Sequence, residues 1–149
     1  MEFSKKRLHD SIYLKKEDRN FYKQSFYESL SIIEDFLSPK KFRNLNLIDI
    51  GSSNGEFLEL TSFKLSDYNI NLFAADIRED LLDVSRHRLE AKNIHVHDYF
   101  QLDISSIASC DELLAKRNGT GFDVIHMSGV HGIFDKTDWL LNLFKLVNK

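Results

Sequence analysis

The sequence predicts an α/β fold, in which helices cover both faces of a parallel sheet in a three-layer αβα arrangement. Short apolar runs alternate with amphipathic segments four times along the 149 residues, at a spacing of roughly 25 residues, about the length of one βα unit. The run at 45–50 is almost continuously apolar, as in a parallel strand buried on both faces. Parallel strands with right-handed crossovers have their carboxyl ends along one edge, so we expect any ligand site there.

The first part of the chain predicts an arm followed by a helix. Residues 1–19 are polar and basic, and we expect them to form an N-terminal arm or lid, with a frayed terminus as the alternative. Asn20 is a suitable helix cap, and the apolar residues from Tyr22 to Leu37 recur at steps of three and four. Pro39 ends this helix, because the residue before a proline is disfavoured in a helix. The length fits a single domain, residues 20–149.

The elements of the sheet follow in order. We expect strands over 45–50, 70–76, 94–97 and 122–127. We expect helices after Gly55, over 79–91, over 110–117 and from Thr137 or Asp138 onward. Asn93 is the expected stop of the second of these helices, because asparagine tolerates the left-handed conformation of a helix end.

Composition restricts the functional classes. The formal net charge of −3 predicts neither a nucleic-acid nor a membrane partner. Residues 1–43 carry ten Lys/Arg against seven Asp/Glu and the remainder ten against sixteen, which we interpret as an ordinary solvated surface. The sequence contains one cysteine, no apolar run of membrane-spanning length and no signal peptide at its start, so we expect a cytoplasmic protein.

The turn after the first strand predicts a nucleotide-type site. Gly51 and Gly55 permit a tight turn that presents the free N–H groups of a helix N-terminus. A nicotinamide fingerprint, G-x-G-x-x-G, fails at Ser53 and at Glu56, although Asp76 lies about where its ribose-binding acid would. An NAD(P)-dependent oxidoreductase is therefore disfavoured and stays an alternative.

These residues carry a family resemblance. Asp49-x-Gly51-x-Ser53-x-Gly55 resembles the first motif of the class I S-adenosylmethionine-dependent methyltransferases, with Ser53 in place of the usual middle glycine. The resemblance implies a Rossmann-like fold with strand order 3-2-1-4 and S-adenosylmethionine as cofactor. It implies that the cofactor is bound by Asp49, Gly51, Ser52, Ser53, Asn54, Gly55, Asp76, Ile77, Asp103, Ile104, Met127, Ser128 and Gly129.

The resemblance also assigns parts of the cofactor. The Asp76 carboxylate, with two acceptor oxygens, would bind both ribose hydroxyls. Asp103 and Ile104 would contact the adenine, and the segment from Met127 to Gly129 would lie beside the methionine moiety. Asp49 has two interpretations: it helps to hold the ammonium of that moiety, or it braces the turn as a structural acid.

Members of this family usually have seven strands, whereas this sequence stops after a fourth strand and its helix. We therefore expect a truncated product, or a partner chain or second copy that covers the fourth strand, because an apolar edge strand favours association. The leading hypothesis is methyl transfer to an acceptor, with a small molecule favoured and nucleic acid not excluded. The alternative is a cofactor-binding or partner-binding module without catalytic activity.

Few other residues suggest chemistry. His131, near the fourth strand together with His126, is a weak candidate for a general base, although a packing role is favoured. His95 and His97 lack a third ligand at a recognisable spacing, so we expect no metal site. Cys110 is interpreted as an ordinary residue at the start of a helix.

Overall fold

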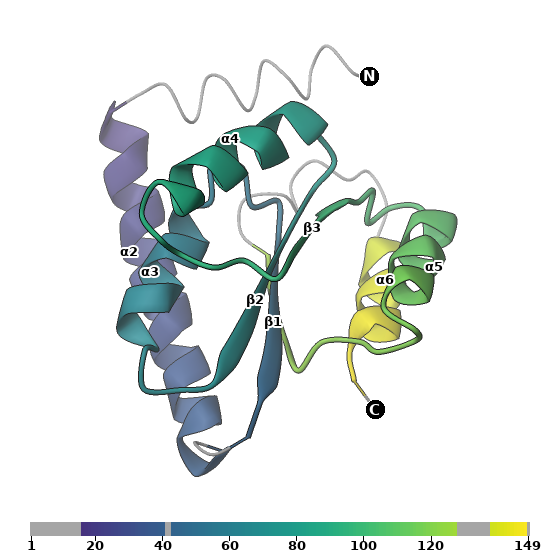
Figure 1. The fold of residues 1–149 in the computed structure, drawn as a ribbon, viewed down its shortest axis with the longest axis horizontal. Coiled ribbons are helices and arrows are strands. Elements are labelled where there is room, and N and C mark those ends of the chain that lie inside the picture. Colours follow the sequence, from purple (N-terminus) through teal and green to yellow (C-terminus); the bar gives the residue numbers. More distant parts are fainter. Residues whose placement is uncertain (1–15, 41–42, 128–137, 149) are drawn as a thin grey trace.

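A parallel sheet stands between two groups of helices (Figure 1). The computed structural model describes residues 16–40, 43–127 and 138–148, and for 16–22, Lys40 and Asp138 it describes the backbone alone. Its strands are β1 (Leu45–Ile50), β2 (Ile70–Asp76), β3 (Asp98–Gln101) and β4 (Val124–Met127). They are parallel, in the order β3-β2-β1-β4. The predicted fold class and strand order are confirmed.

The register aligns the carboxyl ends of the strands. Ile50 of β1 pairs with Ala75 of β2 and with Met127 of β4. Asp76 of β2 pairs with Gln101 of β3. The segments that follow β1, β2 and β3 therefore leave the sheet side by side, along the edge where the sequence predicts a site.

The helices form the two outer layers. In chain order they are α2 (Lys16–Leu37), the short 3₁₀ helix η1 (Ser38–Lys40), α3 (Glu56–Lys64), α4 (Glu79–Glu90), α5 (Ile107–Lys116) and α6 (Asp138–Leu146). Helices α2, α3 and α4 contribute to one apolar core and α5 and α6 to the other. In Figure 1 these two groups lie on opposite sides of the sheet.

Alternation along β1 explains both cores. Leu45 and Leu47 point into the core beneath α2, α3 and α4, whereas Ile48 and Ile50 point into the core beneath α5 and α6. The near-continuous apolar run of this strand is therefore the signature of a strand buried on both faces. Asp49 interrupts the run on the α2 side.

Helix α2 begins at Lys16, four residues before the predicted cap at Asn20. The chain from Lys16 to Leu37 contains no glycine or proline that would prevent the helix from extending toward the N-terminus. Part of the predicted 1–19 arm therefore belongs to this helix, and residues 1–15 lie outside the described part. The helix ends at Leu37, two residues before Pro39, as expected.

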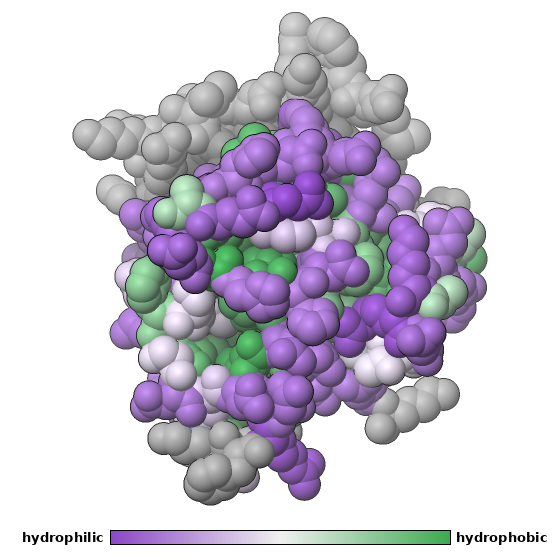
Figure 2. Space-filling model, in the orientation of Figure 1, coloured by the Kyte–Doolittle hydropathy of each residue, from purple (hydrophilic) through white to green (hydrophobic). Residues whose placement is uncertain are grey.

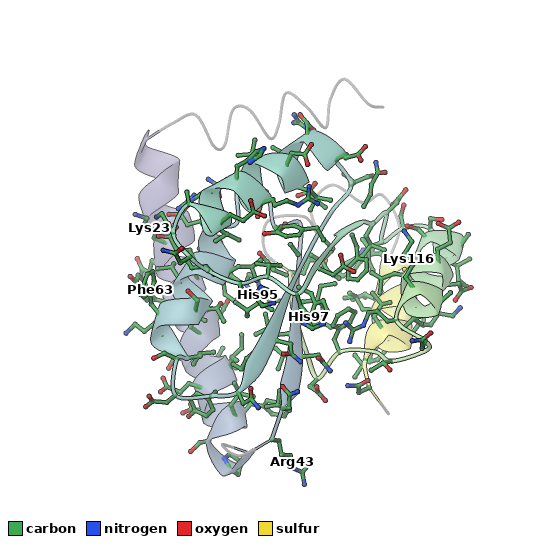
Figure 3. The ribbon with its side chains drawn as sticks, viewed as in Figure 1. Lys23, Arg43, Phe63, His95, His97 and Lys116 are labelled. Carbon is green, nitrogen blue, oxygen red and sulfur yellow. The ribbon has the colours of Figure 1, made fainter. Side chains whose placement is uncertain are left out.

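The predicted strand over 94–97 is wrong, because the third strand starts at Asp98. Helix α4 ends at Glu90, and Asn93, three residues later, adopts the left-handed conformation expected of it, with φ +57°. The Ile94 N–H donates to the Leu89 carbonyl at 2.9 Å. Residues 94–97 connect the end of α4 to the start of β3. His95 and His97 therefore lie on the segment that leads into β3 (Figure 3) and not on a strand face.

Two further boundaries differ from the prediction. Helix α5 begins at Ile107, after Ser106, whose hydroxyl accepts from the Ser109 N–H at 3.3 Å. Cys110 is thus inside the helix and fully buried, not at its start. Strand β4 begins at Val124, because Phe122 pairs instead with Val147, in an isolated parallel bridge.

The face of the molecule in Figure 2 is mainly polar. Figure 2 shows hydrophilic residues over most of the face in view, with apolar residues visible between them. The exposed apolar side chains include Leu141 and Phe144 of α6, which are 69% and 74% exposed. Among the described helices, none combines the length and the apolar character needed to cross a bilayer.

Candidate functional site

The turn between β1 and α3 is held against the neighbouring strand. The N–H groups of Gly51 and Ser52 both donate to the Ala75 carbonyl, at 2.8 and 3.0 Å. Gly51 has φ +77°, a conformation that a side chain disfavours. The turn therefore begins with a residue that relieves backbone strain and with two hydrogen bonds that anchor it to β2.

Ser53 occupies the position where the resembled motif has its middle glycine. Its backbone adopts φ +49°, in the left-handed region. A residue with a Cβ pays a modest penalty of roughly 1–2 kcal/mol there. The substitution of serine for glycine thus leaves the backbone path of the turn intact.

Asp76, at the end of β2, joins the second strand to this turn. Its Oδ2 accepts the Ser53 N–H at 2.9 Å, and its Oδ1 accepts the Arg78 N–H at 3.0 Å. The side chain is buried, with 6% of its surface exposed. Hydrogen bonds to backbone N–H groups favour the charged form of a carboxylate. The motif residues and the predicted ribose-binding acid therefore form one connected unit.

Gly55 serves packing between two helices. A Cβ at this position would lie 2.5 Å from Ser85 Oγ and 2.9 Å from Leu89 Cδ1, both on α4. The glycine thus permits α4 to approach the start of α3, in addition to its φ of +77°. Glycine is therefore required at position 55 by the close packing of α3 against α4.

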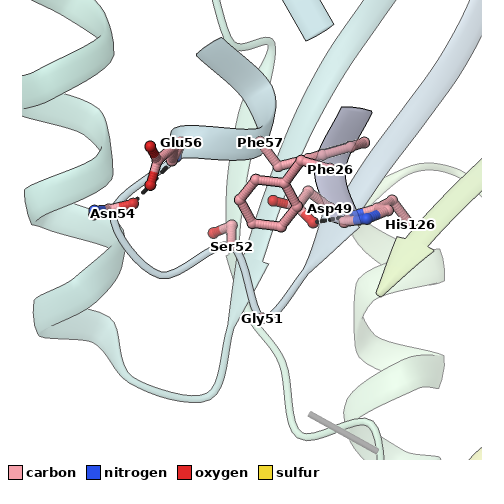
Figure 4. Close-up of a pocket in the computed structure, with 8 residues that line it drawn as sticks. All are labelled: Phe26, Asp49, Gly51, Ser52, Asn54, Glu56, Phe57 and His126. Atoms are coloured by element: carbon pink, nitrogen blue, oxygen red, sulfur yellow. Dashed lines mark hydrogen bonds and ion pairs between the residues drawn. The ribbon is translucent and has the colours of Figure 1, made fainter. Parts of the chain in front are cut away.

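A buried acid–histidine pair lies beside the turn (Figure 4). Asp49 Oδ1 is 2.7 Å from His126 Nδ1, across the β1–β4 pairing that aligns these two residues. Both side chains are almost fully buried. The imidazole stacks on the Phe57 ring, with centroids 3.4 Å apart and planes 9° apart, and the Phe26 ring meets it edge-on at 5.9 Å.

A small pocket opens between this pair and the turn. The residues that line it are Phe26, Asp49, Gly51, Ser52, Asn54, Glu56, Phe57 and His126. Ser52 Oγ is buried and has no hydrogen-bond partner among the described residues. Since a buried hydroxyl without a partner is unfavourable, this atom indicates a position where a polar ligand group fits.

The residues predicted to contact adenine lie on the segment after β3. Leu102 donates its N–H to the Asp76 carbonyl at 2.9 Å, which holds this segment beside the ribose-binding candidate. Asp103 Oδ1 accepts from the Ser105 N–H at 3.0 Å. The Ile104 side chain is buried in the core, and its carbonyl accepts from Asn142 Nδ2 at 2.8 Å.

The structure therefore brings most of the predicted site residues to one edge. The turn from Gly51 to Gly55 is joined to Asp76 by a hydrogen bond from the Ser53 N–H, and Asp49 lines a small pocket together with Gly51 and Ser52. Met127 ends β4 opposite Ile50. Ile77 is 43% exposed beside them, and its carbonyl accepts from Gln101 Nε2 at 3.2 Å. Ser128, Gly129 and His131 lie outside the described residues, so their predicted roles stay predictions.

Sequence reasoning missed the pairing of His126 with Asp49. Both residues lie one position before the last residue of their strands, and the implied strand order makes β1 and β4 neighbours. Because the two residues have the same position in neighbouring strands, the sequence could have indicated that they lie side by side. The contact of Asn142 with the Ile104 carbonyl had no signal in the sequence, because it depends on how α6 packs.

Cys110 is a buried residue of the core beneath α5 and α6. Burial and the neighbouring charge of Asp111 raise the pKa of the Cys110 thiol to about 11, so it is an inert core residue. No group of three or more His, Cys, Asp or Glu side chains in the described parts of the chain is arranged to hold a metal ion.

Comparisons with known proteins match the fold. No family model and no curated protein matches the sequence. An S-adenosylmethionine-dependent methyltransferase from Clostridium acetobutylicum ATCC 824 has a TM-score of 0.62 and 13% identity, covering 98% of this chain and 53% of that chain. The plantazolicin methyltransferase BpumL, in complex with SAH and a pentazolic desmethylPZN analog, has a TM-score of 0.60 and 20% identity, covering 95% and 53%.

A third match is PKMT2 from Rickettsia typhi, in complex with AdoHcy, with a TM-score of 0.52 and 18% identity, covering 70% of this chain and 19% of that chain. The chain spans about half the length of the first two structures. Its fold is that of the Rossmann-like S-adenosylmethionine-dependent methyltransferases, over about half of their length.

Proposed function

We propose that this chain binds S-adenosylmethionine at the carboxyl edge of its sheet and belongs to a methyltransferase that acts on a small-molecule acceptor. The observation that carries the proposal is the hydrogen bond from the Ser53 N–H to Asp76 Oδ2, at 2.9 Å. It couples the glycine turn to a buried acid at the end of the adjacent strand. A carboxylate fixed in this way suits two neighbouring hydroxyls, such as those of a ribose.

Three segments of the chain would each bind a different part of the cofactor. The turn from Gly51 to Gly55 would hold the backbone of the methionine part, and Asp76 the ribose. Asp103 and the backbone of Ile104 would face the adenine. When bound, S-adenosylmethionine would supply a methyl group on its positively charged sulfonium, and attack of a nucleophile on that carbon would break the carbon–sulfur bond and release the neutral thioether. The residues of this chain would bind and orient the cofactor, because such a displacement depends mainly on alignment.

A dinucleotide fits this turn less well. Glu56 places a carboxylate at the first position of α3, where the phosphates of a dinucleotide would meet the helix N-terminus. Like charges at this position repel, whereas S-adenosylmethionine carries no phosphate. The nicotinamide alternative is therefore the weaker proposal, and comparison of NADH binding with S-adenosylhomocysteine binding decides between them.

The alternative proposal is a cofactor-binding or partner-binding module without catalytic activity; the chain spans about half the length of the matched methyltransferases. Detection of methyl transfer to any acceptor in a cell extract, by this chain alone and with a labelled methyl group, would eliminate that alternative. Cofactor binding without any transfer would support it.

Calorimetry with S-adenosylhomocysteine tests the proposal. We expect saturable binding at one site, and a loss of at least about tenfold in affinity for Asp76→Ala, because the ribose hydroxyls and the Ser53 N–H lose a charged acceptor. Asp98→Ala is the matched control, since it removes an exposed acid at the far end of β3. Equal binding by wild type and Asp76→Ala would overturn the ribose assignment. The absence of binding by wild type would overturn the proposed function.

A further inference from the structure

Asn142 of α6 is a buried amide that bonds the backbone of the segment after β3. Helix α6 lies beside α5 in Figure 1, and its Leu146 belongs to the same apolar core as the Ile104 side chain. Asn142 is 6% exposed, and its Nδ2 donates to the Ile104 carbonyl at 2.8 Å. Since burial of an amide is unfavourable without a hydrogen-bond partner, this bond explains how an asparagine is accommodated there.

The peptide group between Ile104 and Ser105 is held at both ends. Asn142 donates to its carbonyl, and its N–H, which belongs to Ser105, donates to Asp103 Oδ1 at 3.0 Å. The Ser105 hydroxyl donates to the same carboxylate oxygen at 2.5 Å. A hydrogen bond at one end of a peptide group strengthens the bond at the other end, because each polarises the group. Asn142 is therefore connected to the Asp103 carboxylate through a single peptide group.

The other hydrogen-bonding groups of this segment are only partly engaged. Leu102 donates its N–H to the Asp76 carbonyl at 2.9 Å. Asp103 donates its N–H to Ser109 Oγ at 3.1 Å. Among the hydrogen bonds of the described residues, none involves the Ile104 N–H or Asp103 Oδ2. The segment therefore has one donor and one acceptor, on adjacent residues, that are available to a ligand.

We propose that Asn142 is a positioning residue that makes the cofactor site selective for adenine over hypoxanthine. Adenine presents an acceptor at N1 and a donor at its amino group, which match the Ile104 N–H and Asp103 Oδ2. Hypoxanthine reverses both, with a donor at N1 and a carbonyl oxygen. To accommodate the reversed pattern, the peptide after Ile104 would have to rotate and lose its bonds to Asn142 and to Asp103. This inference rests on the proposed function, because it concerns the base of the same ligand.

Calorimetry with S-adenosylhomocysteine and with S-inosylhomocysteine, in which hypoxanthine replaces adenine, tests the inference. We expect wild type to prefer the adenine ligand by about a hundredfold or more, because hypoxanthine would leave both protein groups unpaired. Asn142→Leu removes the donor at similar size, so this preference should fall by about tenfold or more, while the affinity for S-inosylhomocysteine stays near that of wild type. Asn71→Leu is the matched control and should keep the preference, because Asn71 Nδ2 donates to Asn46 Oδ1, at 3.1 Å, near the opposite edge of the sheet.

The outcomes separate positioning from a structural role. If Asn142→Leu weakens both ligands equally, or if it keeps the preference of wild type, the inference is overturned and Asn142 serves packing alone. If wild type binds both ligands equally, the inference also fails. Binding of neither ligand by wild type would overturn the proposed function itself.

A measurement on wild type keeps the test decisive if Asn142→Leu does not fold. Side-chain amide ¹H–¹⁵N resonances of Asn142 and Asn71 are recorded during titration with each ligand. We expect saturation with S-adenosylhomocysteine to shift the Asn142 resonances more than saturation with S-inosylhomocysteine does, because only the adenine ligand engages both available groups of the segment. The Asn71 resonances should not move with either ligand. Equal shifts of Asn142 with both ligands, or shifts no larger than those of Asn71, would contradict the role assigned to Asn142.

Discussion

Replacement of Gly55 by alanine tests the packing of the glycine turn. Gly55 precedes α3 and has φ +77°. The added methyl group would lie 2.5 Å from Ser85 Oγ and 2.9 Å from Leu89 Cδ1. Both distances are shorter than any normal van der Waals contact, so α3 and α4 would have to separate or the turn would have to change its path.

The structure gives the size of the effect. A left-handed conformation costs a residue with a Cβ about 1–2 kcal/mol, and overpacking of a core costs about 1–3 kcal/mol. The reduced entropy of the unfolded alanine chain returns up to about 1 kcal/mol. We therefore expect Gly55→Ala to lower the free energy of unfolding by about 2–4 kcal/mol.

Urea unfolding followed by circular dichroism measures this change. Ser85→Ala is the matched control, because Ser85 Oγ is buried without a partner among the described residues. Alone it should change stability by less than about 0.5 kcal/mol. Combined with Gly55→Ala it should recover about 1 kcal/mol of the loss, because the shortest contact disappears. A Gly55→Ala protein as stable as wild type, or a double variant with no recovery, would refute the packing role.

Three further predictions concern charge, reactivity and association. Burial acts to raise the pKa of Glu59, but hydrogen bonds and charges from Lys92 and Arg88 outweigh it and lower that pKa. Glu59→Gln should therefore lower the free energy of unfolding by about 1 kcal/mol near pH 7, and this difference from wild type should vanish as the pH falls through the folded-state pKa of the Glu59 carboxyl. Urea unfolding of both proteins, at pH 7 and in acid below that pKa, measures the difference. A difference that persists in acid would contradict the prediction. Iodoacetamide should modify Cys110 slowly in the native protein and fast in urea, because the thiol is buried and its pKa is raised to about 11; equal rates would count against the buried position. We propose that a second copy or a partner chain covers β4, at the edge of the described sheet, and the exposed Phe144 of α6. Light scattering should then give a mass above that of a 17.4 kDa monomer, and Phe144→Glu should lower the measured mass. A stable monomer would contradict self-association.

Local patterns predicted most of the fold. The apolar run of β1, the turn after it and the acidic start of α4 each had a direct sequence signature, and all three lie where expected. The third strand was misplaced because Ile94 and Val96 alternate with polar residues as in a strand. Val96 does point into the core, but from the connection that leads to the strand.

The candidate site could be proposed from the sequence where its residues are close together in the chain. The turn from Gly51 to Gly55 and the acid Asp76 were identified from spacing and from the family resemblance, and Ser53 shows why the departure from that pattern is tolerated. The pairing of Asp49 with His126 depends on the register of two strands that are 77 residues apart in sequence. Such contacts are decided by tertiary packing, which local periodicity does not specify.

Mapping of the ligand by NMR tests the central claim most directly. Amide ¹H–¹⁵N spectra recorded during titration with S-adenosylhomocysteine report which backbone groups change. We expect the largest shifts at the turn from Gly51 to Gly55, at Ile77 and at Ile104, with little change at Ile70 and Asp123 near the opposite edge of the sheet. Shifts that gather at that opposite edge, or no shifts at a saturating ligand concentration, would contradict a cofactor site at the carboxyl edge.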